Sequence, residues 1–441
     1  MKRVKLMFCV LISFILGING VSAVNFYGEP LNSESVYVVN ENTKLPVIEK
    51  NIHQKRSPAS LTKIMTFIVA YESINDATKE KVLVRQEVLD MVDPESSGVH
   101  LKAGEEISVF NLMHCILICS SGYAAIVLAD YVGEGNMQNF VDKMNEKAGA
   151  LGCENTHFVN PDGIYDENQY TTAFDMYRIT EYARNISLFN NITSMCEYRC
   201  FGDERDPIIT TNLTMDRKRG AEYYCPYVRG IKTGYTHEAG RCLISCAENN
   251  GVNYVGIVMG GYADDKDGGS SSKNMAMLDT KNIYTWIYKN LRIDKLYPKD
   301  IPLAETELKY VWGNDKLLLY PEKDFNSVVF SDFDAQDVAL ELQIPEYVAA
   351  PVKAGNVLGK ADVFYRGERV GELNLVSVKD YRMSWFVRTV DFCKDIVSNP
   401  VFLVIFGIFW MFAFLYFRAC IKKERARRNR AKVRRFRRKI K

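Results

Sequence analysis

Apolar side chains in the first half of the chain recur at the spacing of a helix. This period predicts a helix over residues 58–75, where Pro58 fits the first helical position and Ser57 fits the cap. It predicts further helix over residues 108–132, and residues 171–185 form another amphipathic stretch. We therefore expect this part of the chain to be mainly helical.

From Tyr227 onward the apolar period changes from that of a helix to that of a strand. Three candidate strands are Tyr227–Thr233, Arg241–Ala247 and Val252–Met259, and Asn250-Gly251 between the last two predicts a hairpin turn. A helix over Lys273–Leu291 follows. Helices followed by antiparallel strands predict an α+β domain that ends near residue 293.

After Pro298 the chain is rich in short β patterns. Arg366-Gly367-Glu368 predicts a tight turn between the last two of them. The candidate strands are Tyr310–Trp312, Leu317–Tyr320, Val328–Phe330, Val338–Leu342, Asp362–Tyr365 and Gly371–Val376. We expect a small β-sandwich over residues 299–378 and a stalk over residues 379–397.

The two ends of the chain carry membrane signals. Residues 1–23 combine a basic start, an apolar run and a small-residue cleavage site, which is typical of a secretory signal peptide; a buried first helix is the alternative. Residues 398–417 are almost entirely apolar and long enough to span a bilayer. Basic residues after the span place the tail inside. We predict a single-pass protein of the cell membrane with an extracellular body.

Charge is distributed unevenly along the 441 residues, although the formal net charge is only +2. Residues 418–441 contain 14 Lys and Arg against Glu424 alone, and the body of the chain is acidic. A basic segment directly after a membrane span favours anionic lipid as its partner over nucleic acid, the other ligand of such tails. We expect no nucleic acid partner.

Cysteine and histidine usage argues against a metal centre. The chain has 11 Cys and five His but no Cys-x-x-Cys pair, so a zinc site is not expected, and no cofactor is predicted. Cys242 and Cys246 stand four residues apart on one predicted strand, which is too far for a disulfide. We expect the cysteines to be mostly free thiols.

Ser60-Leu61-Thr62-Lys63 places a hydroxyl and an amine three residues apart on one helical face. Ser60 falls in the first turn, where free backbone N–H groups stabilise an oxyanion and disfavour the charged form of a nearby lysine. A neutral Lys63 could take the proton of Ser60, which is the activation that a serine nucleophile needs. The spacing alone also occurs by chance.

Lys232-Thr233-Gly234 lies at the end of a predicted strand. A second ammonium group near Lys63 would lower the pKa of Lys63 by repulsion, and Thr233 with Lys232 could hold a substrate carboxylate. Gly234 permits close approach of another backbone. Taken alone, the three residues also fit a solvated turn.

With their flanks, the two motifs resemble the D-alanyl-D-alanine carboxypeptidases, which are low-molecular-mass penicillin-binding proteins. The resemblance runs from about Ser35 to Asn290 and continues more faintly to Val376. It is carried by Pro58-Ala59-Ser60-Leu61-Thr62-Lys63-Ile64-Met65-Thr66, His157-Phe158-Val159-Asn160-Pro161-Asp162-Gly163, Ala173-Phe174-Asp175-Met176, Thr211-Asn212-Leu213 and Gly230-Ile231-Lys232-Thr233-Gly234-Tyr235-Thr236. It implies a penicillin-binding/β-lactamase-like transpeptidase domain over residues 24–293, the family's C-terminal β domain, and then the transmembrane helix.

The resemblance also implies an acyl-enzyme hydrolase. Ser60 would attack the carbonyl between the terminal D-alanines of a peptidoglycan stem pentapeptide, with Lys63 as general base. The N–H groups of Ser60 and Tyr235 would form the oxyanion hole, and Lys232, Thr233 and Gly234 would bind the substrate end. β-Lactam antibiotics would acylate the same serine.

The middle motif of the family, Ser-x-Asn, departs from the pattern. Ser120-Ser121-Gly122 occupies its position, so Ser120 could shuttle a proton to the leaving amine, but Gly122 replaces the asparagine. A glycine donates no side-chain hydrogen bond to the substrate or to Lys63. Losing such a hydrogen bond would cost about 1–3 kcal/mol of transition-state binding, or roughly 10- to 100-fold in rate. Ser120 could otherwise be a buried hydroxyl at a helix start.

Three functions stay open at this stage. The first is a membrane-anchored carboxypeptidase. The second, motivated by Gly122, is a binding protein that holds stem peptides with little turnover. The third is a β-lactamase, which shares the Ser-x-x-Lys motif, but the appended β domain and the membrane span disfavour it.

Overall fold

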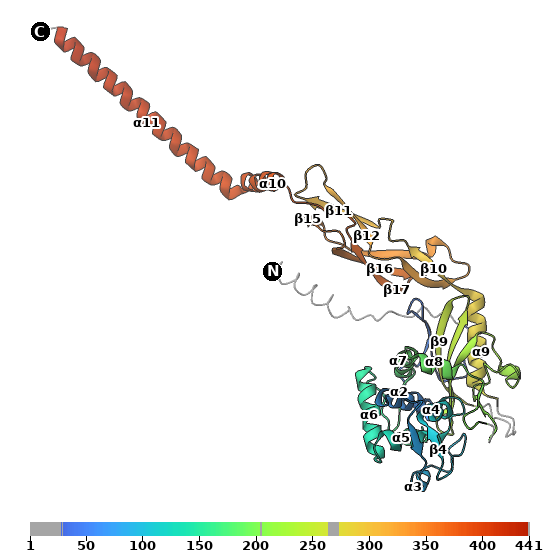
Figure 1. Cartoon of the computed structure of the whole chain (residues 1–441). Helices are drawn as coiled ribbons and strands as arrows, with labels where there is room; N and C mark the ends of the chain where they lie inside the picture. The colour runs from blue at the N-terminus through green and yellow to red at the C-terminus, as the bar shows by residue number, and fades with distance from the viewer. Residues whose placement is uncertain (1–27, 29, 203–204, 263–272, 440–441) are drawn as a thin grey trace. The chain divides into compact units, whose positions relative to one another are not determined.

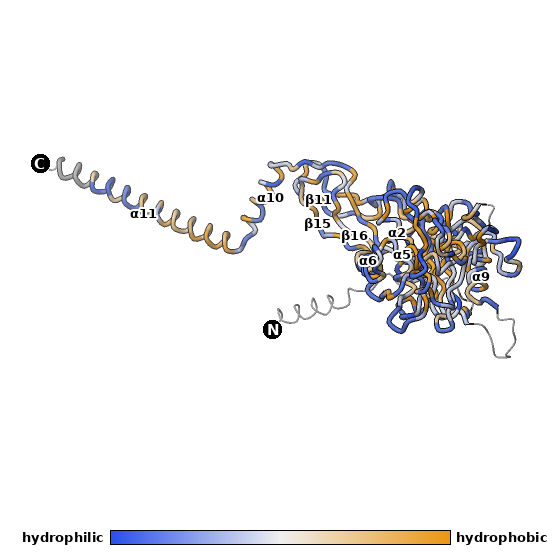
Figure 2. Tube along the Cα trace, turned by 60° about the horizontal axis from the view of Figure 1, so that its bottom comes forward, coloured by the Kyte–Doolittle hydropathy of each residue, from blue (hydrophilic) through white to orange (hydrophobic). Residues whose placement is uncertain are grey.

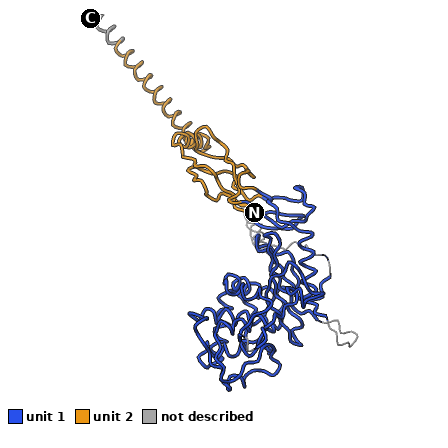
Figure 3. The backbone as a smooth tube through the Cα atoms, turned by 45° about the vertical axis from the view of Figure 1, so that its right-hand side comes forward, with its two compact units in different colours: residues 1–297, 324–341, 362–372 blue, residues 298–323, 342–361, 373–441 orange. Residues whose placement is uncertain are grey.

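The computed structural model describes residues 28, 30–202, 205–262 and 273–439, with side chains up to residue 431, and the predicted signal peptide lies outside this range. The chain divides into two compact units (Figure 3). Unit 1 comprises residues 1–297, 324–341 and 362–372, and unit 2 comprises the rest.

A five-stranded antiparallel sheet forms the framework of unit 1, with the order β2-β1-β9-β8-β7. The hairpin turn predicted at Asn250-Gly251, between β8 and β9, is confirmed, because both residues have positive φ, 51° and 81°. The strands are β1 (Ser35–Asn40), β2 (Pro46–Lys50), β7 (Val228–Thr236), β8 (Gly240–Asn249) and β9 (Val252–Gly261). β7 is the last strand of this order, so one of its edges faces away from the sheet.

Helices cover both faces of this sheet (Figure 1). On one face α9 (Met275–Asn290) packs against β8 and β9, where Ser245 Oγ lies 3.0 Å from Tyr284 Oη. Because strand side chains alternate, Ile244 faces the opposite way and joins a large apolar core. The helices on that side are α2 (Lys63–Ser73), α4 (Val109–Leu117), α5 (Gly122–Val132), α6 (Met137–Ala150), α7 (Ala173–Arg184) and α8 (Ser187–Thr193).

Short elements complete the part of unit 1 that precedes α9. Strands β3 and β4 pair with each other, and so do β5 and β6. The bounds of these elements are β3 (Lys81–Leu83), α3 (Gln86–Leu89), β4 (Glu106–Ser108), β5 (Glu197–Tyr198), β6 (Ile208–Ile209) and η2 (Ala221–Tyr223).

The start of the first predicted helix differs from the expectation. Residues Ala59–Thr62 form a 3₁₀ turn, η1, and the α-helix begins only at Lys63. Pro58 precedes the turn and no side chain caps it, so the predicted Ser57 cap is wrong. The cause is Ala59, whose left-handed φ of 45° makes the chain enter through a sharp bend.

The helix predicted over residues 108–132 is interrupted between α4 and α5. Ser108 caps α4 by accepting from Asn111 N at 3.1 Å, and Ser121 caps α5 by accepting from Ala124 N at 3.2 Å. Ser120 between them has φ 61°. The apolar period continues across the break between α4 and α5, so the sequence pattern did not reveal the break. In contrast, the amphipathic stretch 171–185 is confirmed as α7, which is capped by the Thr172 side chain.

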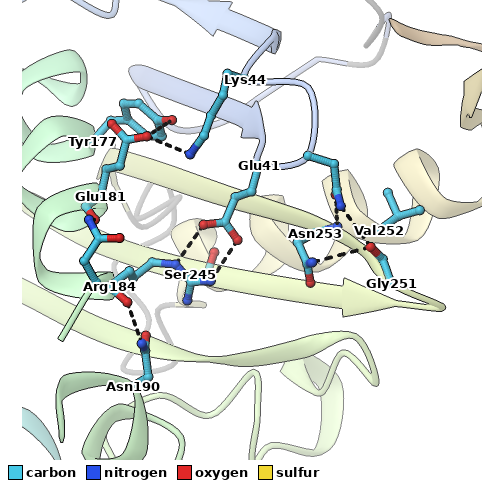
Figure 4. Close-up of polar contacts among 12 residues, drawn as sticks. Glu41, Lys44, Tyr177, Glu181, Arg184, Asn190, Ser245, Gly251, Val252 and Asn253 are labelled. Carbon is cyan, nitrogen blue, oxygen red and sulfur yellow. Dashed lines mark hydrogen bonds and ion pairs between the residues drawn. The ribbon is translucent and has the colours of Figure 1, made fainter. Parts of the chain in front are cut away.

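A polar network ties the turn after β1 to α7 and to the hairpin end of β9 (Figure 4). Arg184 donates two hydrogen bonds to the carboxylate of Glu41, at 2.9 and 2.8 Å. Lys44 Nζ lies 2.8 Å from Glu181 Oε1, and Asn253 N donates to Asn42 Oδ1 at 2.8 Å. Both members of the Arg184–Glu41 pair are about four-fifths buried. The network therefore joins parts of the sheet and of a helix that are distant in sequence.

The chain after α9 is all-β up to residue 376, as predicted. The predicted strand Tyr310–Trp312 is wrong, because Tyr310 has φ 66° and ends the preceding strand. β10 and β13 pair with each other, and the order of the larger sheet is β14-β16-β17-β12-β11-β15. The elements are β10 (Leu291–Tyr297), β11 (Ala304–Lys309), β12 (Lys316–Pro321), β13 (Phe325–Phe330), η4 (Ala335–Asp337), β14 (Val338–Gln343), β15 (Tyr347–Ala349), β16 (Val357–Tyr365) and β17 (Glu368–Val376).

Two helices end the described chain. α10 (Trp385–Ser398) occupies the predicted stalk and ends one residue beyond it, and α11 (Pro400–Lys439) contains the predicted span except for its first two residues. Figure 2 shows α11 changing from hydrophobic to hydrophilic along its length. Within the described residues, Pro400–Ala431 is the one helical segment that contains a stretch long and apolar enough to cross a bilayer, and an 18-residue window of it has a mean hydropathy of 2.3. This is compatible with a membrane anchor by length and composition.

Candidate active site

A cleft of about 300 Å³ in unit 1 collects the residues singled out in the sequence. Its walls come from η1 and the start of α2, from the break between α4 and α5, from the segment after residue 160, and from β7. Its lining includes Ser60, Lys63, Ser96, Ser120, Asp162, Thr233, Gly234 and Tyr235. The structure thus brings all three motifs to one cavity.

Ser60 and Lys63 are in direct contact. Lys63 Nζ lies 3.0 Å from Ser60 Oγ and also donates a short hydrogen bond to the backbone carbonyl of Asp162. The pair forms because η1 presents Ser60 one turn before Lys63 at the first position of α2. Lys63 is only 2% exposed.

Burial changes the acid–base chemistry of Lys63. It lowers the pKa of the ammonium from 10.5 to about 8, against the opposing charge of Asp162. From the sequence we expected the positive end of the helix and repulsion by Lys232 to lower this pKa, but burial is the dominant cause. At neutral pH a useful fraction of Lys63 is therefore neutral, within reach of the Ser60 proton.

The segment His157–Gly163 fixes the position of Asp162 against α2. Thr66 Oγ1 donates to Pro161 O at 2.5 Å, and Asn160 Oδ1 accepts from Gly163 N at 2.8 Å. Gly163 has φ 84°, and a Cβ there would stand 2.0 Å from Ala59 O. Only glycine fits this close approach of two backbones beside the nucleophile turn.

Ser120 and Lys232 form the second contact of the cleft. Lys232 Nζ donates to Ser120 Oγ at 2.8 Å and to Thr233 O at 2.8 Å. Lys232 is 1% exposed, and burial, followed by repulsion from Lys63, lowers its pKa well below the usual value. Ser120 is held in its left-handed conformation, as is common for strained residues at functional sites.

The free edge of β7 supplies the remaining wall. A Cβ at Gly234 would meet Pro58 O at 3.2 Å and Ala59 Cβ at 3.3 Å, so glycine allows the strand to lie close to the nucleophile turn. The hydroxyls of Thr233 and Thr211 are hydrogen-bonded to each other. Tyr235 follows as an exposed side chain at the mouth of the cleft.

Some lining residues were not predicted as site residues. Thr211 belongs to a motif that the sequence resemblance contained without a role. Arg241 lines the cleft with its guanidinium carbon 3.9 Å from the ring centroid of Tyr235, its partner in the β7–β8 register. An antiparallel register drawn between the first two candidate strands could have found Arg241. Ser96 lies in a loop with no periodic pattern, and no sequence signal pointed to it.

Among the described residues, no group of three or more His, Cys, Asp or Glu side chains is placed to hold a metal ion. The ten cysteines described are free thiols, and Cys115 and Cys200 approach each other to 3.5 Å between sulfurs.

Comparison with known families gives two matches that together cover most of the chain. Residues 23–263 match the family described as D-alanyl-D-alanine carboxypeptidase. Residues 294–382 match the C-terminal domain of penicillin-binding protein 5.

Curated relatives and solved structures agree with these matches. The chain is 27% identical to the D-alanyl-D-alanine carboxypeptidase DacF of Bacillus subtilis over 80% of this chain and 87% of that protein. It is 28% identical to DacA of Escherichia coli, over 82% and 87%. Penicillin-binding protein 5 of Haemophilus influenzae has the same fold, with a TM-score of 0.62 and 23% identity over 81% and 99% of the two chains. The Streptomyces K15 DD-transpeptidase superposes with a TM-score of 0.52 and 26% identity, over 60% and 99%.

Proposed function

Since the chain belongs to the D-alanyl-D-alanine carboxypeptidase family and is a serine-type hydrolase, we propose that it works through an acyl-enzyme on Ser60. The substrate is a peptidoglycan stem pentapeptide, whose terminal D-alanine is released. The observation that carries this proposal is the 3.0 Å contact between Ser60 Oγ and the buried amine of Lys63. A lysine with a pKa near 8 is matched to proton transfer around neutral pH.

Acylation begins with neutral Lys63 taking the proton of Ser60 as the serine oxygen attacks the penultimate carbonyl carbon. The oxyanion that forms is stabilised by the N–H groups of Ser60 and Tyr235. The proton taken up by Lys63 passes through the hydroxyl of Ser120 to the nitrogen of the departing D-alanine, which leaves Lys63 neutral again, and the contact of Ser120 with Lys232 supports this role. Water then attacks the ester while Lys63 accepts its proton. As the ester bond breaks, Lys63 returns this proton to the Ser60 oxygen, which releases the shortened peptide and restores the serine.

Recognition of the substrate carboxylate falls to the β7 side of the cleft. Thr233 offers a hydroxyl there, Arg241 supplies positive charge from the neighbouring strand, and Gly234 leaves room for the peptide along the strand edge. The buried amine of Lys232 lies behind this wall and contacts Ser120. A cationic wall explains a preference for a free carboxyl terminus, because charge-assisted hydrogen bonds to a carboxylate are about twice as strong as neutral ones.

Release of D-alanine from a synthetic stem pentapeptide tests this function. We expect turnover by the wild type and none by Ser60→Ala, with both proteins showing the same thermal unfolding midpoint. A wild type that binds the peptide without releasing D-alanine would instead support the second candidate, a non-catalytic peptidoglycan-binding protein, which Gly122 favours. Rapid hydrolysis of penicillin would support a β-lactamase.

We also propose that α11 anchors the enzyme in the cell membrane with the active site outside. The apolar half of α11 is long enough for a bilayer, and the basic half suits the anionic inner leaflet. Protease added to intact cells should then digest the catalytic domain but spare an epitope tag placed after Lys441. Loss of the tag while the catalytic domain stays intact would show the opposite orientation.

A further inference from the structure

The space beside Gly122 in the cleft wall is occupied by the side chain of Ser96, which comes from another segment of the chain. A Cβ built at Gly122 would lie 2.6 Å from both Cβ and Oγ of Ser96, and 3.4 Å from Asp162 Oδ2. Carbon atoms in contact normally stand about 3.5–4.0 Å apart. The space that a side chain at position 122 would occupy is therefore taken by Ser96, which itself lines the cleft.

Ser96 is held in this place by backbone bonds between its loop and the start of α5. Gly122 N donates to Ser97 O at 2.9 Å, and Ser121 Oγ donates to Val99 O at 2.8 Å. A Cβ at Gly98 would stand 2.4 Å from the Cα of Ser121, so the two segments are in backbone contact. The loop is thus a built part of the wall rather than a separate flap.

The hydroxyl of Ser96 has a defined orientation. Ser96 Oγ donates to Asp162 Oδ2 at 3.1 Å, and the backbone carbonyl of Asp162 is the group that accepts from Lys63. A hydroxyl has one proton and two lone pairs. With its proton directed to the carboxylate, Ser96 has lone pairs left to accept an N–H from a peptide in the cleft.

We propose, on the premise that the proposed function holds, that Ser96 is a substrate-binding residue that replaces the missing side chain of position 122. Its oxygen accepts a peptide N–H of the stem peptide beside the scissile bond. Gly122 and Ser96 then form a coupled pair, in which the absence of one side chain makes room for the other. In this proposal, Ser96 of the 93–99 loop compensates for the missing asparagine of the Ser-x-Asn motif, so the glycine at position 122 does not abolish function.

A double-mutant cycle tests this coupling. The proteins are the wild type, Ser96→Ala, Ser96→Thr, Ser96→Gly, Gly122→Asn and the double variant Ser96→Gly/Gly122→Asn. Gly149→Asn is the matched control, because Gly149 lies in helix α6 with nothing within 4 Å of its built Cβ. Each protein is assayed for the rate of acylation by a fluorescent penicillin, for kcat and KM of D-alanine release, and for thermal unfolding.

We expect Ser96→Ala to reduce kcat/KM for the peptide about tenfold, the size expected for one lost hydrogen bond, while Ser96→Thr retains most of it. Gly122→Asn should reduce kcat/KM by more than tenfold, because the new side chain collides with Ser96. The double variant should recover to within a few-fold of the wild type, since the amide then fills the emptied space. Gly149→Asn should leave the kinetics unchanged.

Two outcomes overturn the inference and are distinguishable from failure of the proposed function. If kcat/KM of the double variant falls by the product of the losses in Ser96→Gly and Gly122→Asn, the two positions are not coupled. If Ser96→Ala turns over the peptide like the wild type, Ser96 does not bind substrate. Ser96→Ala creates no clash, so it decides the matter even where Gly122→Asn fails to fold. If the wild type itself releases no D-alanine, the proposed function fails and the role of Ser96 falls with it.

Discussion

Lys63 and Lys232 are as buried as core leucines, and this burial decides what they can do. A lysine in water is almost fully charged at neutral pH and cannot accept a proton. Inside the cleft, desolvation favours the neutral amine, and the contacts with Ser60 and Ser120 aim each amine at one hydroxyl. A sequence motif can indicate that a serine and a lysine share a face, but only the fold determines how far the lysine is removed from water.

The rate of acylation should therefore depend on the protonation of Lys63. The pKa is lowered to about 8, so the reactive neutral form is scarce at pH 6 and dominant at pH 9. We expect the acylation rate to rise about tenfold per pH unit below pH 8 and to level off above it. Stopped-flow labelling from pH 6 to 9.5 measures this profile. A rate that stays flat over this range would contradict the role of Lys63 as the base.

Gly163 gives a second test at the scale of one residue. Gly163→Ala should abolish acylation and lower the free energy of unfolding by about 2–4 kcal/mol, because its Cβ collides with Ala59 O and its φ is left-handed. Gly135 is the matched control, since it has φ 83° but nothing within 4 Å of its built Cβ. Gly135→Ala should cost only about 1 kcal/mol and leave acylation intact. Equal losses in both variants would show that strain, and not the close approach, is responsible.

Among the elements, those with strong local patterns were predicted well. α7, α9 and the β7–β9 meander follow from periodicity and from the Asn250-Gly251 turn. β1 was not predicted, because its pairing with β9 joins residues more than 200 positions apart and leaves no local signature. The break before Ser121 was hidden for a different reason. Apolar side chains continue through it, while the left-handed Ser120 that the site needs has no period.

The network in Figure 4 gives a prediction at the scale of elements. Arg184→Ala should lower the free energy of unfolding by about 1–3 kcal/mol, because it leaves the partly buried Glu41 carboxylate without its two hydrogen bonds. Arg184→Lys should recover only part of this, since lysine lacks the planar fork. Lys79→Ala removes an exposed ion pair with Asp76 and should have no measurable effect in the same urea titration. A fully stable Arg184→Ala would mean that the network contributes nothing.

At the scale of the whole molecule, the order of parts matches an enzyme held near a membrane. The residues that line the active site lie before residue 291, the all-β segment follows them, and α10 and the apolar start of α11 come last. The apolar segment and the basic run were predicted from composition and charge, whereas the catalytic domain was predicted from its motifs and the β domain from its strand patterns. The helix α10 inside the predicted stalk was not anticipated as a separate element, although its amphipathic content was visible in the sequence.

Removing α11 should separate anchoring from chemistry. A chain that ends at Asn399 should no longer need detergent for extraction in high salt, while its acylation rate stays that of the full chain. Anchoring is expected to depend on the apolar segment Pro400–Ala431 and the site on unit 1. Cell fractionation followed by penicillin labelling measures both properties. A truncated chain that still requires detergent would assign the anchor to another segment.

In the proposed mechanism the Ser60 oxygen becomes covalently bonded to the acyl group. Intact-mass and peptide mass spectrometry of the protein after brief exposure to a β-lactam detects this bond. We predict one adduct of the mass of the intact antibiotic, located on the peptide that contains Ser60 and absent from Ser60→Ala. An unmodified protein, or an adduct on any other residue, would contradict the account.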